Sequence, residues 1–304
     1  MKSSKHGCLI FLLIPGFFIA VVSPAMAGGG SGMSERFANA LYLGINDDPV
    51  QLTDGRWEGE PYTDDGASRP SVGLVEDFVL TGDLDGDGTD ESVVLLWQSS
   101  GGSGTYDYIA ALRQDGGEVL NVGTAGLGDR VQIRRGEISN GAIYLDVIQQ
   151  GEDDAACCPG QRARRSWVLD EDGLQEMDSE YQGDLSASTI EGDEWTLIRG
   201  GKDQWSEDAT TVTLRARQGQ LSGNSGCNQY SAAIENGTVP GEIRIGPAIA
   251  TRMACPEAQM AVESEFLGRL SLVNKFQFLA GRLVMSGTRD GETFSLVFES
   301  ISGN

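Results

Sequence analysis

Residues 39–177 consist of short apolar runs separated by glycine-rich turns. β-Branched and aromatic residues gather, partly with period-two alternation, at residues 92–97, 105–112, 130–138, 142–148 and 164–169. This enrichment and this alternation are typical of β-strands. The stretch shows no amphipathic helix of useful length, so we predict an all-β domain over residues 39–177.

The segment that follows is polar and acidic and has no periodicity, which predicts a linker at residues 178–190. A second domain is predicted over residues 191–304. It contains further strand-like runs at residues 195–199, 210–217, 219–223, 242–247, 275–279, 282–287 and 293–298. The whole chain is therefore predicted to be mainly β.

One helix is predicted between the strands of the second domain. Pro256 fits the first helical position, and a stripe with helical spacing follows at Val262, Phe266, Leu270 and Val273. We expect this stripe to fill the core of a bent antiparallel sheet or barrel, which makes the second domain α+β.

The N-terminus has the pattern of a secretory signal peptide. Two lysines precede an apolar run at residues 8–22, and a small-residue motif, AMA, follows at residues 25–27. We predict cleavage after Ala27, then a flexible Gly/Ser tether at residues 28–38. The mature protein is expected in the periplasm or outside the cell, without stable membrane insertion.

The chain is strongly acidic. Removal of the predicted leader takes away two lysines and no acid, which changes the formal charge from −23 to −25. Such a charge repels phosphate backbones and anionic lipid surfaces, so nucleic acid is not an expected partner. Cations and basic partners are favoured.

Histidine chemistry is excluded from the mature protein, because His6 is the one histidine in the sequence and it lies in the predicted leader. A chain without histidine cannot form a Ser-His-Asp or Cys-His relay, or a His-ligated zinc site. We find no other catalytic motif and expect a protein that is not an enzyme.

The segment GDLDGDGTDES at residues 82–92 carries the strongest candidate chemistry. Oxygen ligands alternate along it in the manner of a calcium-binding loop. They are Asp83, Asp85, Asp87, the carbonyl of Thr89 and Glu91. Val94 stands where an EF-hand requires a bidentate glutamate, so an EF-hand is excluded. The alternative is a polar turn, because Asp-Gly pairs are also a hairpin signal.

Several motifs of the second domain resemble the META domain, also called the HslJ family. They are Trp195 with Leu197, then Gly226-Cys227-Asn228 with Tyr230, then Thr251, Met253 and Cys255, and a helix with Glu263 or Glu265. The resemblance covers roughly residues 190–302 and implies a compact, barrel-like α+β fold. It also implies an envelope or secreted bacterial protein linked to stress and antibiotic tolerance, without established catalysis.

The acidic loop resembles the calcium loops of FG-GAP repeats, which join two strands. Apolar flanks on both sides of the loop agree with that resemblance. A bound Ca²⁺ is expected to be structural, since nothing beside the loop has the pattern of a nucleophile or a catalytic acid.

Four cysteines remain after the leader, and they allow three complete pairings. The META resemblance implies a disulfide between Cys227 and Cys255. It would close a loop of about 28 residues, worth about 3 kcal/mol in the loop-entropy account. Cys157 and Cys158 would then form a vicinal disulfide or stay reduced.

The sequence as a whole favours a secreted or periplasmic, non-catalytic stress or binding protein whose partner is an unidentified envelope protein or small ligand. One alternative is an adhesion or assembly protein that binds basic surfaces. Another is a carboxylate-based glycan hydrolase, for which no spacing of acids singles out a catalytic pair.

Overall fold

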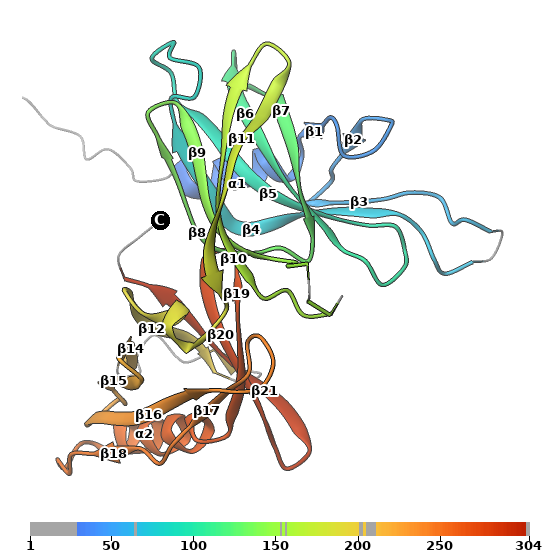
Figure 1. Cartoon of the computed structure of the whole chain (residues 1–304). Coiled ribbons are helices and arrows are strands. Elements are labelled where there is room, and N and C mark those ends of the chain that lie inside the picture. Colours follow the sequence, from blue (N-terminus) through green and yellow to red (C-terminus); the bar gives the residue numbers. More distant parts are fainter. Residues whose placement is uncertain are drawn as a thin grey trace, which may run out of the picture.

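The computed structural model describes residues 29–63, 66–152, 154–155, 157–200, 203–204 and 211–301. It is mainly β, as predicted, and its N-terminal and C-terminal parts form separate sheets. Figure 1 shows these parts as an upper and a lower body. The predicted leader at residues 1–27 lies outside the described residues. Among the described residues, no helix is both long and apolar enough to cross a bilayer.

The upper body is a sandwich in which a sheet of order β3-β4-β5-β6-β7 packs on a sheet of order β11-β10-β9-β8. The strands of the first sheet are β3 (Arg56–Glu58), β4 (Ser71–Gly82), β5 (Glu91–Ser99), β6 (Tyr106–Asp115) and β7 (Glu118–Asp129). Those of the second are β8 (Gln132–Ser139), β9 (Ala142–Gln149), β10 (Gln161–Asp170) and β11 (Gly173–Asp184). The runs predicted as strands fall in β5, β6, β8, β9 and β10, whereas β4, β7 and β11 had weaker patterns.

Strand β5 is buried on both of its faces. Val93 and Leu95 pack into the cluster between the two sheets. Val94 and Leu96 point the opposite way, into a second cluster. Successive side chains of a strand alternate between faces, so an unbroken apolar run needs cover on both sides. The run Val93–Leu96 of β5 is such a segment, and it has an apolar cluster on each side.

The outer face of this sheet is covered by α1 (Gly29–Ala38), β1 (Leu41–Tyr42) and β2 (Val50–Gln51). The prediction of a flexible tether at residues 28–38 is therefore wrong. Phe37 is only 1 % exposed, and the hydroxyl of the buried Tyr42 donates to the Phe37 carbonyl at 2.9 Å. The Gly/Ser composition predicts flexibility, but burial of Phe37 against the sheet decides the conformation.

The lower body is a curled antiparallel sheet that nearly closes into a barrel. Its strand order is β17-β16-β15-β14-β12-β21-β20-β19, with β13 beside β12 and β18 beside β16. An isolated bridge between Glu242 and Lys275 brings the two ends of this order together. The bounds are β12 (Glu194–Gly200), β13 (Asp203–Gln204), β14 (Thr213–Arg217), β15 (Gln220–Asn224), β16 (Gln229–Asn236), β17 (Ile243–Ile245), β18 (Ile249–Ala250), β19 (Val273–Leu279), β20 (Arg282–Arg289) and β21 (Glu292–Ser300).

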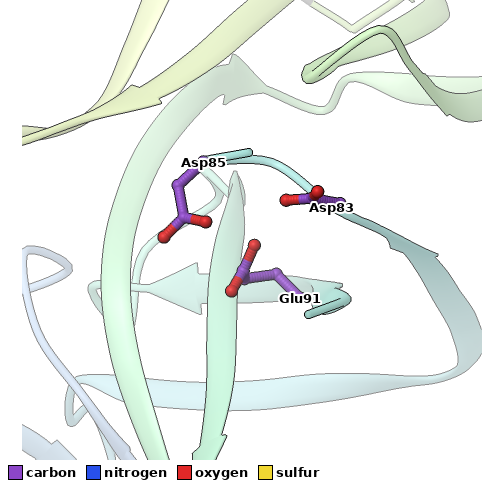
Figure 2. Close-up of side chains that lie close together, drawn as sticks. All are labelled: Asp83, Asp85 and Glu91. Carbon is purple, nitrogen blue, oxygen red and sulfur yellow. The ribbon is translucent and has the colours of Figure 1, made fainter. Parts of the chain in front are cut away.

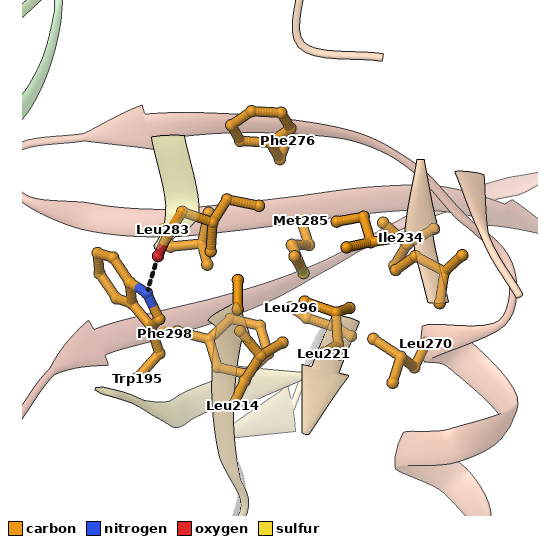
Figure 3. Packing of buried hydrophobic residues seen from close by; sticks show 14 of the residues in the cluster. Trp195, Leu214, Leu221, Ile234, Leu270, Phe276, Leu283, Met285, Leu296 and Phe298 are labelled. Atoms are coloured by element: carbon orange, nitrogen blue, oxygen red, sulfur yellow. Dashed lines mark hydrogen bonds between the residues drawn. The ribbon is translucent and has the colours of Figure 1, made fainter. Parts of the chain in front are cut away.

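Helix α2 (Glu257–Leu270) fills the core of this curled sheet, as predicted. It begins one residue after Pro256. Phe266 and Leu270 are fully buried, and Figure 3 shows Leu270 among apolar side chains of the strands. Val273 is also buried, but it opens β19 and does not extend the helix.

Residues 178–190 do not form a linker. β11 continues to Asp184 along β10, and the 3₁₀ helix η1 (Ala187–Ile190) follows it. Ile190 is fully buried, and its carbonyl accepts the indole N–H of Trp195 at 3.2 Å (Figure 3). Most side chains of β11 are exposed whichever way they point, so the strand shows no alternation of apolar and polar residues.

The two bodies share core residues and backbone hydrogen bonds. Ile148 of β9 belongs to the core cluster of the lower body. In the other direction, the Gly281 amide donates to the Ile133 carbonyl at 2.9 Å. The Phe278 amide donates to Oε1 of Gln132, also at 2.9 Å. Packing of this kind fixes the orientation of one body against the other.

Arg134 of β8 adds a charged contact at the same junction. Its guanidinium donates to the carbonyls of Thr189 and Glu191 at 2.8 and 3.0 Å and to the carboxylate of Asp193 at 2.6 Å. It also lies 5.9 Å from the centre of the Phe278 ring. Charge-assisted hydrogen bonds of this kind hold the connection between β11 and β12 against the sandwich.

Replacement of Phe266 by alanine is expected to lower the free energy of unfolding by about 3–5 kcal/mol, because it leaves a cavity beneath α2. Met260→Ala on the same helix is the control. Met260 is 45 % exposed, so its loss should cost less than about 0.5 kcal/mol. Urea unfolding of both variants measures the difference, and equal costs would contradict the packing described for α2.

Candidate functional site

The acidic loop connects β4 to β5 in the upper body. Gly82 and Glu91 face each other across the two strands and close the loop. Gly86 and Gly88 have positive φ values of 79° and 88°, a conformation that glycine adopts without strain. The two glycines therefore let the chain turn tightly enough for its carboxylates to face inward.

Backbone amides hold the loop carboxylates in place. Asp83 accepts the amide of Gly86 at 2.7 Å on one oxygen and that of Gly88 at 3.1 Å on the other. Asp85 accepts the amide of Asp87 at 3.1 Å. These hydrogen bonds hold the aspartates in place without a ligand, which lowers the entropy cost of binding a ligand there.

Three of the predicted ligands lie together. Figure 2 shows the carboxylates of Asp83 and Asp85 from the loop and of Glu91 from the start of β5 facing one space. Each offers one oxygen, and these oxygens all lie within 4.8 Å of one another. Oxygens that bind Ca²⁺ at 2.3–2.6 Å are at most about 5 Å apart, so the donor set suits a calcium ion in both size and chemistry.

The other two predicted ligands are placed differently. Asp87 is not part of the group of three carboxylates. Its carboxylate accepts the Thr89 amide at 2.7 Å. Thr89 was predicted to contribute its carbonyl, and that contribution stays a prediction. With one oxygen from each residue, the group of three supplies fewer ligands than the six to eight that Ca²⁺ takes, so a bound Ca²⁺ would need second carboxylate oxygens, carbonyls or water as well.

Arg113 of β6 also belongs to the site, and sequence reasoning missed it. Its Nε donates to Oε1 of Glu91 at 3.0 Å, and its Nη2 pairs with Oδ2 of Asp85. Glu91 is fully buried and accepts the Leu84 amide on its other oxygen at 3.1 Å. The hydrogen bond to Glu91, with the nearby Asp85 and Asp87, raises the pKa of Arg113, although desolvation opposes the rise.

Arg113 could have been found only through strand pairing. Ser92 faces Leu112 across β5 and β6, so the next position brings Glu91 opposite Arg113. The guanidinium neutralises one of the negative charges in the loop. The remaining aspartates still favour a cation, because like charges about 4 Å apart repel by roughly 1 kcal/mol per pair even in water.

The motif residues of the lower body form a second polar cluster. Glu263 of α2 accepts hydrogen bonds from the Ser225 hydroxyl at 2.6 Å, the Asn228 amide at 2.8 Å and the Asn228 side chain at 3.0 Å. Asn228 accepts in turn from the Thr251 hydroxyl at 2.8 Å and the Met253 amide at 2.7 Å. The cluster joins the β15–β16 turn, the segment before α2 and the helix itself.

Glu263, and not Glu265, is therefore the helix glutamate that contacts the motif. Glu265 lies at the helix surface, where it pairs with Arg269 and Arg289. Partial burial raises the pKa of Glu263, but hydrogen bonds from Ser225 and from Asn228 outweigh it, so the pKa lies below its usual 4.5. The carboxylate is ionised at neutral pH.

The structure contains two disulfides among its described residues. Cys227 is joined to Cys255, with 6.0 Å between their Cα atoms. This bond ties the turn before β16 to the start of α2, beside the Glu263 cluster. Cys157 is joined to its neighbour Cys158 in the segment between β9 and β10.

Comparison with known proteins identifies the lower body. Residues 188–300 match the family model of the META domain. This part of the chain is a META domain, as its motifs indicated. The comparison with curated proteins gave no match.

One solved structure that resembles the chain is the "NMR structure of the protein from Burkholderia xenovorans". It is 20 % identical over 41 % of this chain and 97 % of that chain, with a TM-score of 0.29. A likeness of this size is too weak to bear on fold or function.

Replacement of Glu263 by glutamine is expected to cost about 1–3 kcal/mol of stability at pH 7, because the new amide group faces the donors of Ser225 and Asn228. The pKa of Glu263 is lower in the folded state, so its contribution is complete above about pH 5 and is lost as the pH falls through the folded pKa. The difference between wild type and Glu263→Gln should therefore shrink at pH 3.

Chemical unfolding at pH 7 and pH 3 measures this difference. Glu265→Gln is the matched control, because its ion pairs are partly exposed and worth less than about 1 kcal/mol. A cost for Glu263→Gln that is the same at both pH values would show that the ionised carboxylate is not what the cluster needs.

Proposed function

We propose that the protein is an exported, non-catalytic stress or binding protein of the bacterial envelope, in which a META domain is joined to a sandwich with a calcium-binding loop. The convergence of Asp83, Asp85 and Glu91 on one space carries the calcium part of this proposal. The META domain at residues 188–300 supports the link to stress.

The position of the loop supports a structural role for the ion. β4 and β5 are neighbouring strands of the sandwich, and β5 is buried on both faces. A cation bound between Asp83, Asp85 and Glu91 would link the end of the loop that follows β4 to the first residue of β5. It would thereby hold together the ends of two interior strands of the sheet.

The donor set also supports binding over catalysis. The loop aspartates are held by backbone amides of their own loop, and Asp85 also pairs with Arg113, so the contacts fix these carboxylates in place as ligands. The mature chain has no histidine to serve as a general base near neutral pH. A partner or small ligand would then be bound by surfaces that the ion stabilises.

Calorimetric titration of Ca²⁺ into chelator-treated protein tests the loop. We expect saturable binding, lost in Asp85→Asn/Asp87→Asn, and a rise in melting temperature. A free Ca²⁺ concentration one hundred times the dissociation constant should add about 2.7 kcal/mol to the free energy of unfolding. Asp178→Asn/Glu180→Gln removes the same charge from exposed positions of β11 and should leave binding unchanged.

A titration with no heat and no thermal shift would make the loop a polar turn held by Arg113. The calcium part of the proposal would then be abandoned, and the META domain would remain.

Export makes a separate prediction. Mass spectrometry of the protein recovered from a periplasmic or culture fraction should show an N-terminus at Gly28, because cleavage is expected after Ala27. Protein that retains residues 1–27 and stays in the cytoplasmic fraction would contradict the proposed location.

A further inference from the structure

Arg113 is near two groups of acids. It pairs with Asp85 and Glu91 of the calcium-loop region. Together with Asp85, it also lines a hollow of about 350 Å³ that Asp170 and Glu171 border. Asp170 is the last residue of β10 and Glu171 lies in the turn that follows it, on the opposite sheet of the sandwich.

We propose that Arg113 is an internal competitor of the metal ion. It neutralises the loop when no ion is bound and exchanges to Asp170 and Glu171 when an ion binds. This inference rests on the proposed calcium function and adds its regulation.

Competition follows from the atoms involved. Arg113 binds Oε1 of Glu91 and Oδ2 of Asp85. Both carboxylates belong to the group of three that would hold the ion. A guanidinium and a divalent cation bound to the same carboxylates lie close together and repel each other. At 4 Å this repulsion is about 2 kcal/mol even at the dielectric constant of water, and it grows as the site becomes drier. The two cations therefore weaken each other's binding.

Burial of Glu91 makes the exchange mutual. The carboxylate is 0 % exposed, and Arg113 is the cation that contacts it among the described residues. A buried carboxylate without a counter-charge is strongly unfavourable, so Arg113 can leave only when another cation takes its place. The ion supplies that cation, and the displaced guanidinium then needs a new anionic partner.

Asp170 and Glu171 are suited to that role. Both are exposed, and both border the hollow that Arg113 also lines. The Arg113 side chain is 33 % exposed and lines the hollow, so it is not enclosed by protein. Its new pairs would join β6 to the β10–β11 turn. Occupancy of the loop would thus be transmitted from one sheet of the sandwich to the other.

The test measures calcium affinity by calorimetry in wild type and Arg113→Met. Removal of the competitor is expected to tighten binding roughly tenfold, within the usual range of coupling between sites. Without Ca²⁺, the variant should melt below wild type, and saturating Ca²⁺ should close most of that gap. Arg244→Met is the charge-matched control, because the Arg244 side chain is 82 % exposed in the lower body.

A double-mutant cycle distinguishes the movement of Arg113 to Asp170 and Glu171 from a general electrostatic effect of these two acids on calcium binding. Asp170→Asn/Glu171→Gln should weaken calcium binding in wild type, because displaced Arg113 then lacks its second partner. The same change should have little effect in the Arg113→Met background. An equal effect in both backgrounds would show that Arg113 does not move to this turn, and the exchange would be refuted.

The outcomes also distinguish this inference from the calcium function itself. If wild type binds Ca²⁺ and Arg113→Met binds it equally or more weakly, Arg113 positions the loop and competition is refuted. If neither binds, the calcium function fails and this inference fails with it. If only Arg113→Met binds Ca²⁺, Arg113 competes with the ion as proposed, but the wild-type protein does not carry Ca²⁺ in its loop. Should Arg113→Met not fold without Ca²⁺, Arg113→Lys keeps the charge without the forked geometry, and an intermediate affinity is expected.

Discussion

The carboxylate of Glu91 is fully buried where the acidic loop enters β5, and a buried charge must be matched by donors or by an opposite charge. The Leu84 amide and the Arg113 guanidinium meet this requirement. The loop, β5 and β6 are consequently fixed to one another through a single side chain. Asp85 is drawn to the same guanidinium, so the loop is already folded over the space in which Asp83, Asp85 and Glu91 meet.

The polar cluster of the META domain follows the same rule with different partners. Glu263 is satisfied by neutral donors from Ser225 and Asn228, and the disulfide from Cys227 lies beside it. Gly226 has a φ of 117°, and a Cβ there would lie 3.1 Å from Val262 of α2, so the turn needs glycine. The motif residues in this chain thus connect the β15–β16 turn to α2 through hydrogen bonds and a disulfide, which is a structural role.

The two bodies depend on each other for burial. Ile148 of the sandwich is packed in the core of the META domain, and Arg134 binds the carbonyls of Thr189 and Glu191 at the entrance to β12. In the other direction, the partly buried Ala280 of the META domain packs against the core of the sandwich. The shared packing joins the sandwich to the META domain, so a change in the structure of one would affect the other.

The sequence by itself determined the features that depend on local pattern. The apolar runs of β5 and β9 predicted strands, and the stripe through Phe266 and Leu270 predicted the buried helix, because strand and helix periodicity place nearby residues on a common face. The alternating oxygen ligands of the acidic loop predicted a group of five, of which Asp83, Asp85 and Glu91 lie together.

Only the tertiary structure decided the features that depend on contacts between distant segments. Helix α1 forms in a Gly/Ser-rich stretch because Phe37 is buried against β5. β11 shows no alternation because both of its faces are largely exposed, and its pairing with β10 alone makes it a strand. Arg113 reaches Glu91 through the register of β5 and β6. Such pairings are set by how strands align and pack, and no local stretch of sequence contains that alignment.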